Sequence, residues 1–458
     1  MQTSETDMKS SRLIDYNYEE YVNLSIQWSR WLLKPMGLWP YSSPISRFKR
    51  YIHRLINIVC YSLISFLFIP SSLFVVFEME DTYGKLKQSG PLIFCATGFV
   101  KYYSLINHKA DISECVERIK WDWKNTTNDS DREIMITNAN FGRKLVIVSM
   151  FFMYSGFVFY SIVIPFSMGR VTAEDANITF IPLIFPFTSY FADARYSPLN
   201  EIVFSVQVLG VYLIHSLAPA ACSLAAVLAV HTCGQMQVLM NCLKHLIDGR
   251  SDMSERLDGR VADIVRQHVR VLKYVPVCRF TTAFSFTRCY FVPEEFNSFR
   301  ASLPTTMTTC ITIMGDFRFL TLTKKTLQQI SFAEFLGCTL DICLLGYYII
   351  MELKSNDVTN AVTYMIFLVS FTFNIFIFCY IGEIVAEECR RVGEISYMIE
   401  WYQLQGNKKL CCVLIIAMSN SSTKLTAGNI VELSISTFSS VSDRSLSVYT
   451  YIFVYEEM

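Results

Sequence analysis

The stretch IVFSVQVLGVYLIHSLAPAACSLAAVLAV, from Ile202 to Val230, contains no Asp, Glu, Lys or Arg. A helix rises about 1.5 Å per residue, so this stretch is long enough to cross the roughly 30 Å hydrocarbon core of a bilayer. The sequence therefore predicts an all-α membrane protein with seven transmembrane helices, because six further apolar stretches accompany this one. They are Ile52 to Phe77, Pro91 to Ile106, Leu145 to Phe166, Ile330 to Met351, Ala361 to Ile384 and Leu410 to Phe438.

Lys and Arg residues are concentrated in alternate connections between these stretches. The N-terminal tail and the second, fourth and sixth loops hold 31 of the 40 basic residues, whereas the opposite loops and the C-terminal tail hold six. Basic residues are retained on the cytoplasmic face of a membrane. The skew predicts an inverted topology, with a cytoplasmic N-terminus and an extracellular C-terminus, which is the reverse of a G-protein-coupled receptor.

The second stretch, Pro91 to Ile106, is the weakest of the seven, because it is short and carries Lys101 near its middle. Without it, the 13 basic residues of the loop from His231 to Gln329 would lie outside. That arrangement contradicts the positive-inside rule, so seven spans are expected.

The composition excludes several other classes of protein. The chain is 52% hydrophobic and 17% charged, whereas soluble chains carry about 25% charged residues. The formal net charge is zero, and the basic residues follow membrane sidedness, so no nucleic-acid partner is expected. No phosphate loop, nucleophile elbow or metal-binding motif occurs, so we expect no enzyme, no cofactor and no metal. His215, inside the fourth span, is expected to be structural.

We predict three segments along the chain. Residues 1–51 form a cytoplasmic tail, in which Tyr21 to Leu38 is either an interfacial amphipathic helix or a helix packed on the bundle. Residues 52–441 form the seven-helix domain in the lipid bilayer, with a long inner loop over residues 231–329. This loop begins with a helical hairpin from Met236 to Val275. Residues 442–458 form an atypical C-terminal tail.

The loop from Ser167 to Glu201 is rich in aromatic residues and proline, which is unusual for a solvated connection. We predict that it folds down as a lid over the outer mouth of the bundle. Its sequon at Asn177 predicts glycosylation on the outside. Sequons at Asn125 and Asn128 lie in a loop predicted to be inside, and there the charge distribution outweighs them.

Aromatic residues are concentrated in the outer halves of the predicted spans. They have two interpretations, ordinary packing of the bundle or a pocket for a small volatile or lipophilic ligand. Asp341 lies in the middle of the fifth span and cannot reach water by snorkelling, so it must face protein, water or a partner chain. The candidate ligand-binding residues are Phe94, Phe99, Phe157, Tyr160, Tyr212, Tyr347, Tyr348, Tyr364 and Phe367.

The seventh stretch is interrupted by the polar run from Ser419 to Lys424. A helix that faces lipid does not accommodate so many polar groups, whereas a helix that lines water does. Mixed polar and apolar residues follow the break, and this pattern suits a pore with a hydrophobic constriction. The candidate pore residues are Glu432, Ile435, Phe438 and Val441.

The C-terminal part of the sequence resembles insect odorant receptors. The similarity is close from Thr321 to Val441 and loose from Tyr18 to Cys278. It is carried by CYIGE (Cys379 to Glu383), KLTAG (Lys424 to Gly428), SISTF (Ser434 to Phe438), SFAEFLGC (Ser331 to Cys338) and LLGYY (Leu344 to Tyr348).

This resemblance implies a subunit of an odorant-gated, nonselective cation channel in the plasma membrane of the sensory dendrites of olfactory neurons. It implies a small volatile odorant as ligand and a heterotetramer with the odorant receptor co-receptor. The odorant would bind in the outer halves of the second to sixth helices, and the last helix would line the pore, with Phe438 and Val441 near the constriction. The alternatives are a gustatory-type chemoreceptor, whose last-helix motifs are absent, and a G-protein-coupled receptor, whose Asp-Arg-Tyr motif is absent.

Two segments depart from the family pattern. Residues 280–321 look inserted into the inner loop, as retained intron sequence or a mispredicted exon would be. After Val441, the sequence Ser442-Asp443-Arg444-Ser445 replaces the usual continuation of the last helix. Such a tail is expected to affect conduction rather than ligand binding.

Overall fold

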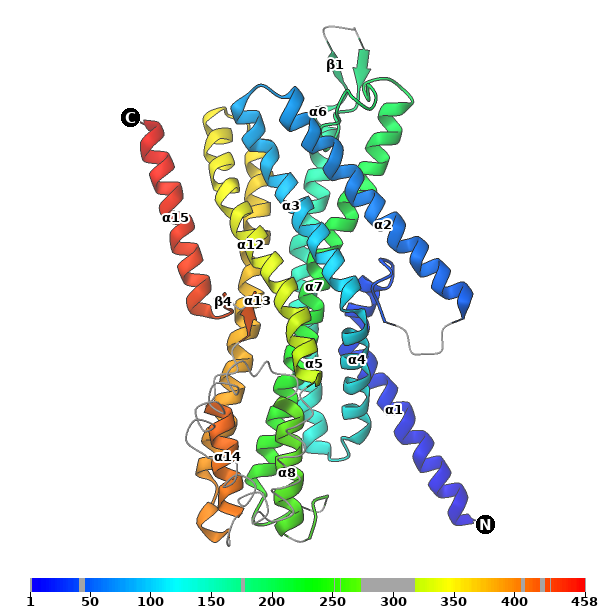
Figure 1. Cartoon of the computed structure of the whole chain (residues 1–458), viewed down its shortest axis with the longest axis vertical. Helices are drawn as coiled ribbons and strands as arrows, with labels where there is room; N and C mark the ends of the chain where they lie inside the picture. The colour runs from blue at the N-terminus through cyan, green and yellow to red at the C-terminus, as the bar shows by residue number, and fades with distance from the viewer. Residues whose placement is uncertain are drawn as a thin grey trace, which may run out of the picture.

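The computed structural model describes residues 2–40, 46–173, 178–250, 252–255, 257–272, 318–404, 408–420, 425–428 and 430–457. The long helices run roughly along one axis, and the chain termini lie at opposite ends of the molecule (Figure 1). Residues 280–317 of the predicted insertion and the predicted glycosylation site Asn177 lie outside the described residues.

In the described residues, six long helices correspond to the first six predicted spans, and a seventh, α15 (Ile435–Glu457), begins near the end of the last predicted span. The long helices are α2 (Arg47–Leu73), α3 (Thr82–Asn107), α5 (Asp129–Val158), α7 (Leu199–Lys244), α12 (Arg318–Lys354), α13 (Val358–Met398) and α15 (Ile435–Glu457). The others are α1 (Gln2–Leu33), α4 (Lys109–Asn125), α6 (Ile164–Met168), α8 (Leu257–Leu272), α14 (Lys408–Asn420), η1 (Phe74–Glu78), η2 (Phe159–Val163) and η3 (Trp401–Gln403). Two antiparallel ribbons pair β1 (Val171–Ala173) with β2 (Ile178–Phe180) and β3 (Thr426–Ala427) with β4 (Val431–Glu432).

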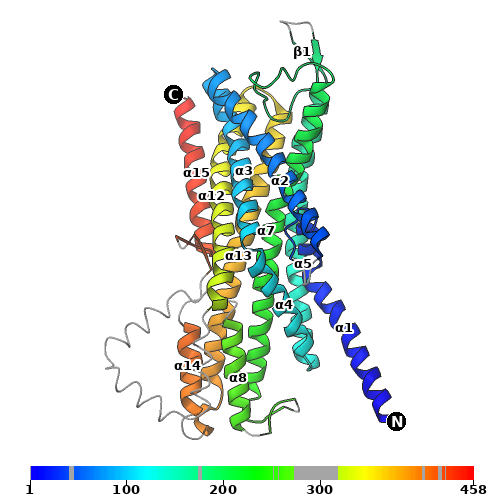
Figure 2. The same cartoon turned by 45° about the vertical axis from the view of Figure 1, so that its right-hand side comes forward.

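The predicted all-α membrane fold is confirmed. Within the described part of the chain, five helical segments are long and apolar enough to cross a membrane: Arg47–Glu78, Asp129–Ser167, Leu199–Lys244, Gln328–Lys354 and Val358–Met398. α3 packs against α12, and α15 packs against α12 and α13. Figures 1 and 2 both place α15 beside α12, near the end of the molecule that carries the β1–β2 ribbon.

The seventh apolar stretch does not form one helix, contrary to the prediction of a single span from Leu410 to Phe438. The stretch is divided among α14, the β3–β4 ribbon and the start of α15. Gly428 has a φ angle of +62°, a left-handed conformation that favours glycine, and it turns the chain between β3 and β4. α14 packs against α13 and α8, near the opposite end of the molecule from the C-terminus (Figure 1).

The last helix also continues beyond its predicted end. The predicted boundary between residues 441 and 442 falls inside α15, which is continuous from Ile435 to Glu457. The reason is visible in its sequence, because the apolar and aromatic run from Val448 to Tyr455 follows the polar turn from Ser442 to Ser445. The polar turn does not interrupt the helix.

Helix α7 forms the centre of the bundle. Its most apolar window of 18 residues is entirely buried, and the helix contacts α5, α13, α2 and α3. The half of α7 from Ala218 to Ala229 is rich in alanine, and small side chains let neighbouring helices approach closely. The predicted helical hairpin is confirmed, since α7 continues to Lys244 and α8 packs back against it.

The described side chains of α1 pack on the bundle, which was one of the two predicted arrangements. The Ser29 and Ser223 hydroxyls lie 2.5 Å apart in a buried hydrogen bond between α1 and α7. Trp123 of α4 donates its indole N–H to Ser25 at 3.0 Å and stacks on Tyr21. The interfacial position remains a prediction; Trp31 is 55% exposed on the outer face of the helix.

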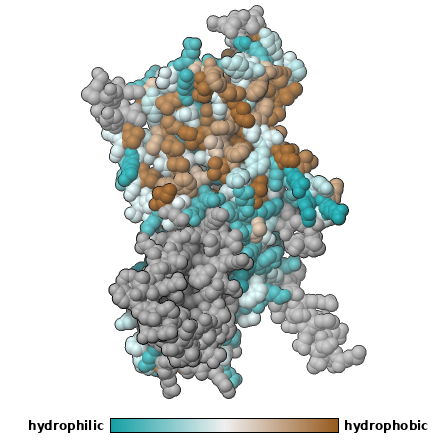
Figure 3. All heavy atoms as spheres, in the orientation of Figure 1, coloured by the Kyte–Doolittle hydropathy of each residue, from teal (hydrophilic) through white to brown (hydrophobic). Residues whose placement is uncertain are grey.

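An apolar band covers the surface in the half of the molecule that contains α2, α3, α12 and α15 (Figure 3). On α2 the exposed side chains include Leu55, Ile58 and Ile69. Contiguous apolar surface of this extent marks contact with another apolar phase. Together with the lengths of the helices, it indicates that lipid surrounds this half of the bundle.

Candidate functional site

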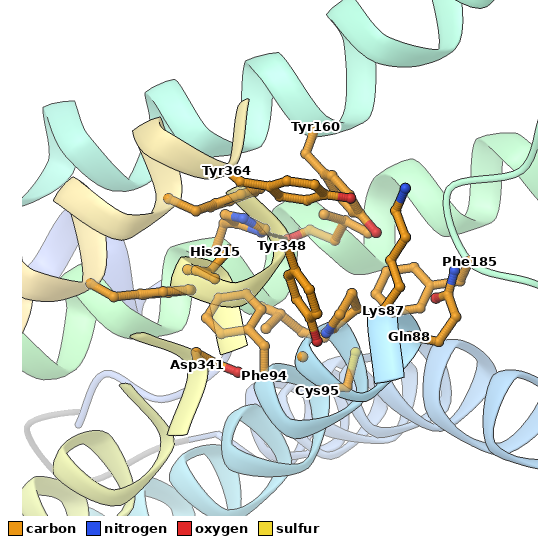
Figure 4. Close-up of a pocket in the computed structure, with 17 residues that line it drawn as sticks. Lys87, Gln88, Phe94, Cys95, Tyr160, Phe185, His215, Asp341, Tyr348 and Tyr364 are labelled. Atoms are coloured by element: carbon orange, nitrogen blue, oxygen red, sulfur yellow. Dashed lines mark hydrogen bonds between the residues drawn. The ribbon is translucent and has the colours of Figure 1, made fainter. Parts of the chain in front are cut away.

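A cavity of about 90 Å³ lies inside the half of the bundle that the apolar band surrounds. Its walls come from α3, η2, α7, α12 and α13, and the loop after β2 contributes Phe185 (Figure 4). The lining residues are Lys87, Gln88, Gly90, Pro91, Phe94, Cys95, Tyr160, Phe185, Val211, Ile214, His215, Asp341, Leu345, Tyr348, Tyr364, Phe367 and Phe371.

Five of the nine candidate ligand-binding residues line this cavity. They are Phe94, Tyr160, Tyr348, Tyr364 and Phe367. Two pairs of these rings are in contact: Tyr160 meets Phe367 with centroids 5.5 Å apart, and Tyr348 meets Tyr364 at 5.5 Å. The structure thus has an aromatic pocket in the half of the bundle next to the β1–β2 ribbon, while the binding role of each residue stays a prediction.

The other four candidates do not line the cavity. Phe157 and Tyr347 lie one layer behind it: the Phe157 ring is 5.9 Å from the His215 ring, and the Tyr347 ring is 6.2 Å from that of Tyr348. Phe99 and Tyr212 are wrongly placed by the prediction, since they are 40% and 50% exposed on the outside of the bundle.

Several lining residues were not among the sequence candidates. Phe371 follows the candidate Phe367 by four positions, so helical spacing could have found it. His215 and Asp341 attracted attention in the sequence only as ionisable groups inside spans. Lys87 carried no such signal because it lies within the predicted first loop.

The outer loop is fixed to α7 by two buried side-chain amides. Gln207 accepts a hydrogen bond from the backbone N–H of Phe185 at 3.1 Å and donates to the carbonyl of Phe185 at 2.9 Å. Asn200 does the same with Ile181, accepting at 2.9 Å and donating at 3.0 Å. A buried backbone group left without a partner costs about 1–3 kcal/mol, so these amides hold Phe185 over the cavity, as the predicted lid requires.

Two buried polar groups on the cavity wall lack hydrogen-bond partners among the described residues. Asp341 is 3% exposed, and neither of its carboxylate oxygens has a partner. The Nδ1 atom of His215 lies 2.9 Å from the carbonyl oxygen of Val211, whereas its Nε2 atom has no partner. In the described ranges, no group of three or more His, Cys, Asp or Glu residues is arranged to hold a metal ion.

A buried ion pair lies next to the cavity. The Lys101 ammonium is 2.5 Å from a Glu334 carboxylate oxygen, and the two side chains are 2% and 1% exposed. Asn374 of α13 donates to the same carboxylate, and the ammonium lies 5.7 Å from the centroid of Phe94, a ring of the cavity wall. Lys101 therefore pairs inside the protein, which explains how a charged residue is accommodated in the weakest predicted span.

A second ion pair lies at the outer rim of the cavity. The Lys87 ammonium donates to Glu352 at 2.6 Å and lies 5.8 Å from the centroid of Tyr364. Lys87 is 31% exposed in this pair, whereas Glu352 is 7% exposed. The cation at the rim is thus already matched by a carboxylate of α12.

The candidate pore residues lie at the junction between β4 and α15. The Phe438 ring packs edge-on against Phe376 of α13 with centroids 5.4 Å apart, and the backbone N–H of Ile435 donates to Glu383 at 3.2 Å. Glu432 and Ile435 are exposed, and Val441 is half-buried. These contacts fix the start of α15 against α13, and a role in a pore stays a prediction.

Comparisons with known proteins agree with this architecture. A family model described as 7tm Odorant receptor matches residues 84–444. Odorant receptor 33c of Drosophila melanogaster is 21% identical over 137 residues, a match that spans 30% of this chain and only 35% of that relative.

Two solved structures of the olfactory receptor OR5 of Machilis hrabei have a similar fold. The structure in complex with eugenol matches with a TM-score of 0.68 and 12% identity, over 95% of this chain and 99% of that one. The structure described without eugenol matches with the same TM-score and 13% identity, over 94% and 99% of the two chains. Since the family model covers most of the sequence, the chain belongs to the seven-transmembrane odorant receptor family.

Proposed function

We propose that this chain is the odorant-binding subunit of a ligand-gated, nonselective cation channel. In this proposal a small volatile molecule binds in the cavity between α3, η2, α7, α12 and α13, and α15 lines the pore. The subunit assembles with the odorant receptor co-receptor as a heterotetramer in the plasma membrane of olfactory dendrites. The N-terminus is cytoplasmic and the C-terminus is extracellular.

The observation that carries the proposal is the aromatic cavity under the loop after β2. Small-molecule sites are concave, mostly apolar and supplied with a few polar groups, and this cavity combines rings from four helical elements with Asp341 and His215. The structure of Machilis hrabei OR5 in complex with eugenol supports the same assignment, because that receptor has a similar fold and was solved with eugenol bound.

The distribution of charge supports the proposed orientation. Figure 1 places α8, α14 and the N-terminus at one end and the C-terminus with the β1–β2 ribbon at the other. The loops rich in Lys and Arg belong to the end with the N-terminus, and basic residues favour the cytoplasmic side.

Cells that express this chain together with an insect odorant co-receptor are expected to give cation currents when exposed to an active volatile from a broad panel. Cells that express either chain alone with the same volatile are expected to give no such volatile-selective current. A response that needs this chain but is carried by a G-protein pathway and not by a direct cation current would contradict the proposal. Surface biotinylation of the chain provides the control for expression.

A further inference from the structure

The cavity contains two hydrogen-bond acceptors that the protein itself leaves unmatched. The carboxylate of Asp341 comes from α12 and is 3% exposed, with no partner on either oxygen among the described residues. A carbonyl oxygen can only accept a hydrogen bond, so the Nδ1 atom of His215 donates to Val211 and carries the ring proton. In the neutral imidazole, Nε2 is then an acceptor, and it too has no partner.

The charges next to the cavity do not balance. Lys101 and Glu334 neutralise each other in their buried pair, and Lys87 is matched by Glu352 at the rim. When ionised, the carboxyl group of Asp341 adds one negative charge that none of these cations matches. A buried charge without a partner costs several kcal/mol, so Asp341 holds a negative charge only when a ligand supplies a positive charge or a strong donor.

The aromatic walls suit the same kind of ligand. A cation within about 6 Å of a ring centroid is attracted by the electron-rich face of the ring, and the cavity presents the rings of Phe94, Phe367 and Phe371 as well as three tyrosines. Figure 4 draws Asp341 and His215 among these rings, on α12 and α7 respectively. A hydrocarbon would fill the same space and leave both acceptors unmatched.

We propose that the cavity selects small volatile amines, whose ammonium group donates hydrogen bonds to Asp341 and His215 while the hydrocarbon part packs against the aromatic rings. An ammonium group offers three N–H donors, which is enough for both acceptors. The volume of about 90 Å³ is smaller than the roughly 150 Å³ cavity that accepts benzene, so a short aliphatic amine fits best. The inference rests on the proposed function, because it takes this cavity as the ligand site.

A series of ligands of equal size tests the head group. n-Butylamine, 1-butanol, butanal and n-pentane each have five heavy atoms and differ in the donor or acceptor at one end. Two readouts are measured on the full chain: the shift of the thermal unfolding midpoint in detergent, which needs no channel activity, and the current in cells with the co-receptor. n-Butylamine is expected to be effective at concentrations at least about tenfold lower than those of butanal and n-pentane in both readouts, because hydrogen bonds to charged groups are the strong ones.

Substitution of the carboxylate identifies its role. Asp341→Asn keeps the shape of the side chain and removes its charge. It is expected to raise the effective concentration of n-butylamine at least about tenfold, while that of n-pentane changes by less than about threefold. The control is Asp357→Asn, which removes a carboxylate at the start of α13 outside the cavity, where asparagine also caps a helix well. This control is expected to leave the preference for the amine intact.

The possible results separate the amine preference of the cavity from the proposed channel function. If butanal or n-pentane matches n-butylamine on the wild-type chain, or Asp341→Asn keeps the amine preference, the inference is wrong and the channel proposal is untouched. If n-butylamine stabilises the wild-type chain but not Asp341→Asn, and no ligand evokes a current with the co-receptor, the inference holds and the channel proposal is contradicted.

Discussion

Replacing Lys101 with methionine is expected to lower the free energy of unfolding by about 3–5 kcal/mol, because it leaves the carboxylate of Glu334 buried without its cation. Glu334 is 1% exposed, forms an ion pair with Lys101 and accepts a hydrogen bond from Asn374. Asp341 lies two helical turns further along α12 on the same side, so the variant also brings two uncompensated acidic groups into one region. The measurement is thermal or denaturant unfolding of the full chain in detergent.

A double variant separates the lost charge from the lost packing. Lys101→Met combined with Glu334→Gln removes both charges and keeps an amide that can bond Asn374, so it should recover most of the stability that Lys101→Met loses. Lys120→Met is the matched control, since Lys120 pairs with Glu117 at 2.7 Å where both side chains are in solvent. Exposed pairs contribute about 0–1 kcal/mol. A loss for Lys101→Met no larger than for this control would contradict the argument.

Gly382→Ala is expected to abolish or greatly reduce the ligand-evoked current while the ligand still binds. A Cβ atom at Gly382 would lie 2.1 Å from the carbonyl oxygen of Leu433 and 2.8 Å from its Cβ. Leu433 joins β4 to α15 and is itself held by a hydrogen bond from its N–H to Leu425 at 2.9 Å. Backbone must therefore move, and the first turn of α15 moves with it. Overpacking of this kind costs about 1–3 kcal/mol.

The cavity lies away from this contact, so the shift of the unfolding midpoint caused by ligand should persist in Gly382→Ala while the current does not. Gly234→Ala is the matched control, because a Cβ there meets the sulfur of the flexible Met135 side chain at 3.0 Å and Asn138 no closer than 3.5 Å. Currents of wild-type size from Gly382→Ala would show that the start of α15 is not coupled to conduction.

The apolar stretches could be read from the sequence because they are local. Charge-free runs such as Ile202 to Val230 place a helix without any knowledge of its neighbours. The position of each aromatic residue along its helix could also be predicted from the sequence, and Phe94, Tyr160 and Phe367 indeed line the same cavity. Their rotation was not readable, since one step along a helix turns a side chain by about 100°. Tyr212 follows the lining residue Val211 by one position and faces outward.

The polar run from Ser419 to Lys424 marked the interruption of the last apolar stretch, but it did not show where α15 begins. That start is set by the turn at Gly428 and by the tertiary contacts of Ile435 and Phe438 with α13. The pairing of Lys101 with Glu334 joins residues that are far apart in sequence, so one sequence could not predict it. Asp341 attracted attention as a buried acid, but only the structure reveals that neither oxygen has a partner in the described region.

The most direct test introduces a phenylalanine into the cavity and, as a control, a phenylalanine on the outer surface of the same helix. Val211 lines the cavity and is 2% exposed, whereas Leu209 on the same helix is 58% exposed on the outer surface. The ligand concentration that evokes a half-maximal current is measured for Val211→Phe and Leu209→Phe with the co-receptor, at equal surface expression. The account predicts that Val211→Phe abolishes the response or raises that concentration by at least about tenfold, while Leu209→Phe behaves like the wild-type chain. An unchanged response in Val211→Phe would contradict the assignment of this cavity as the odorant site.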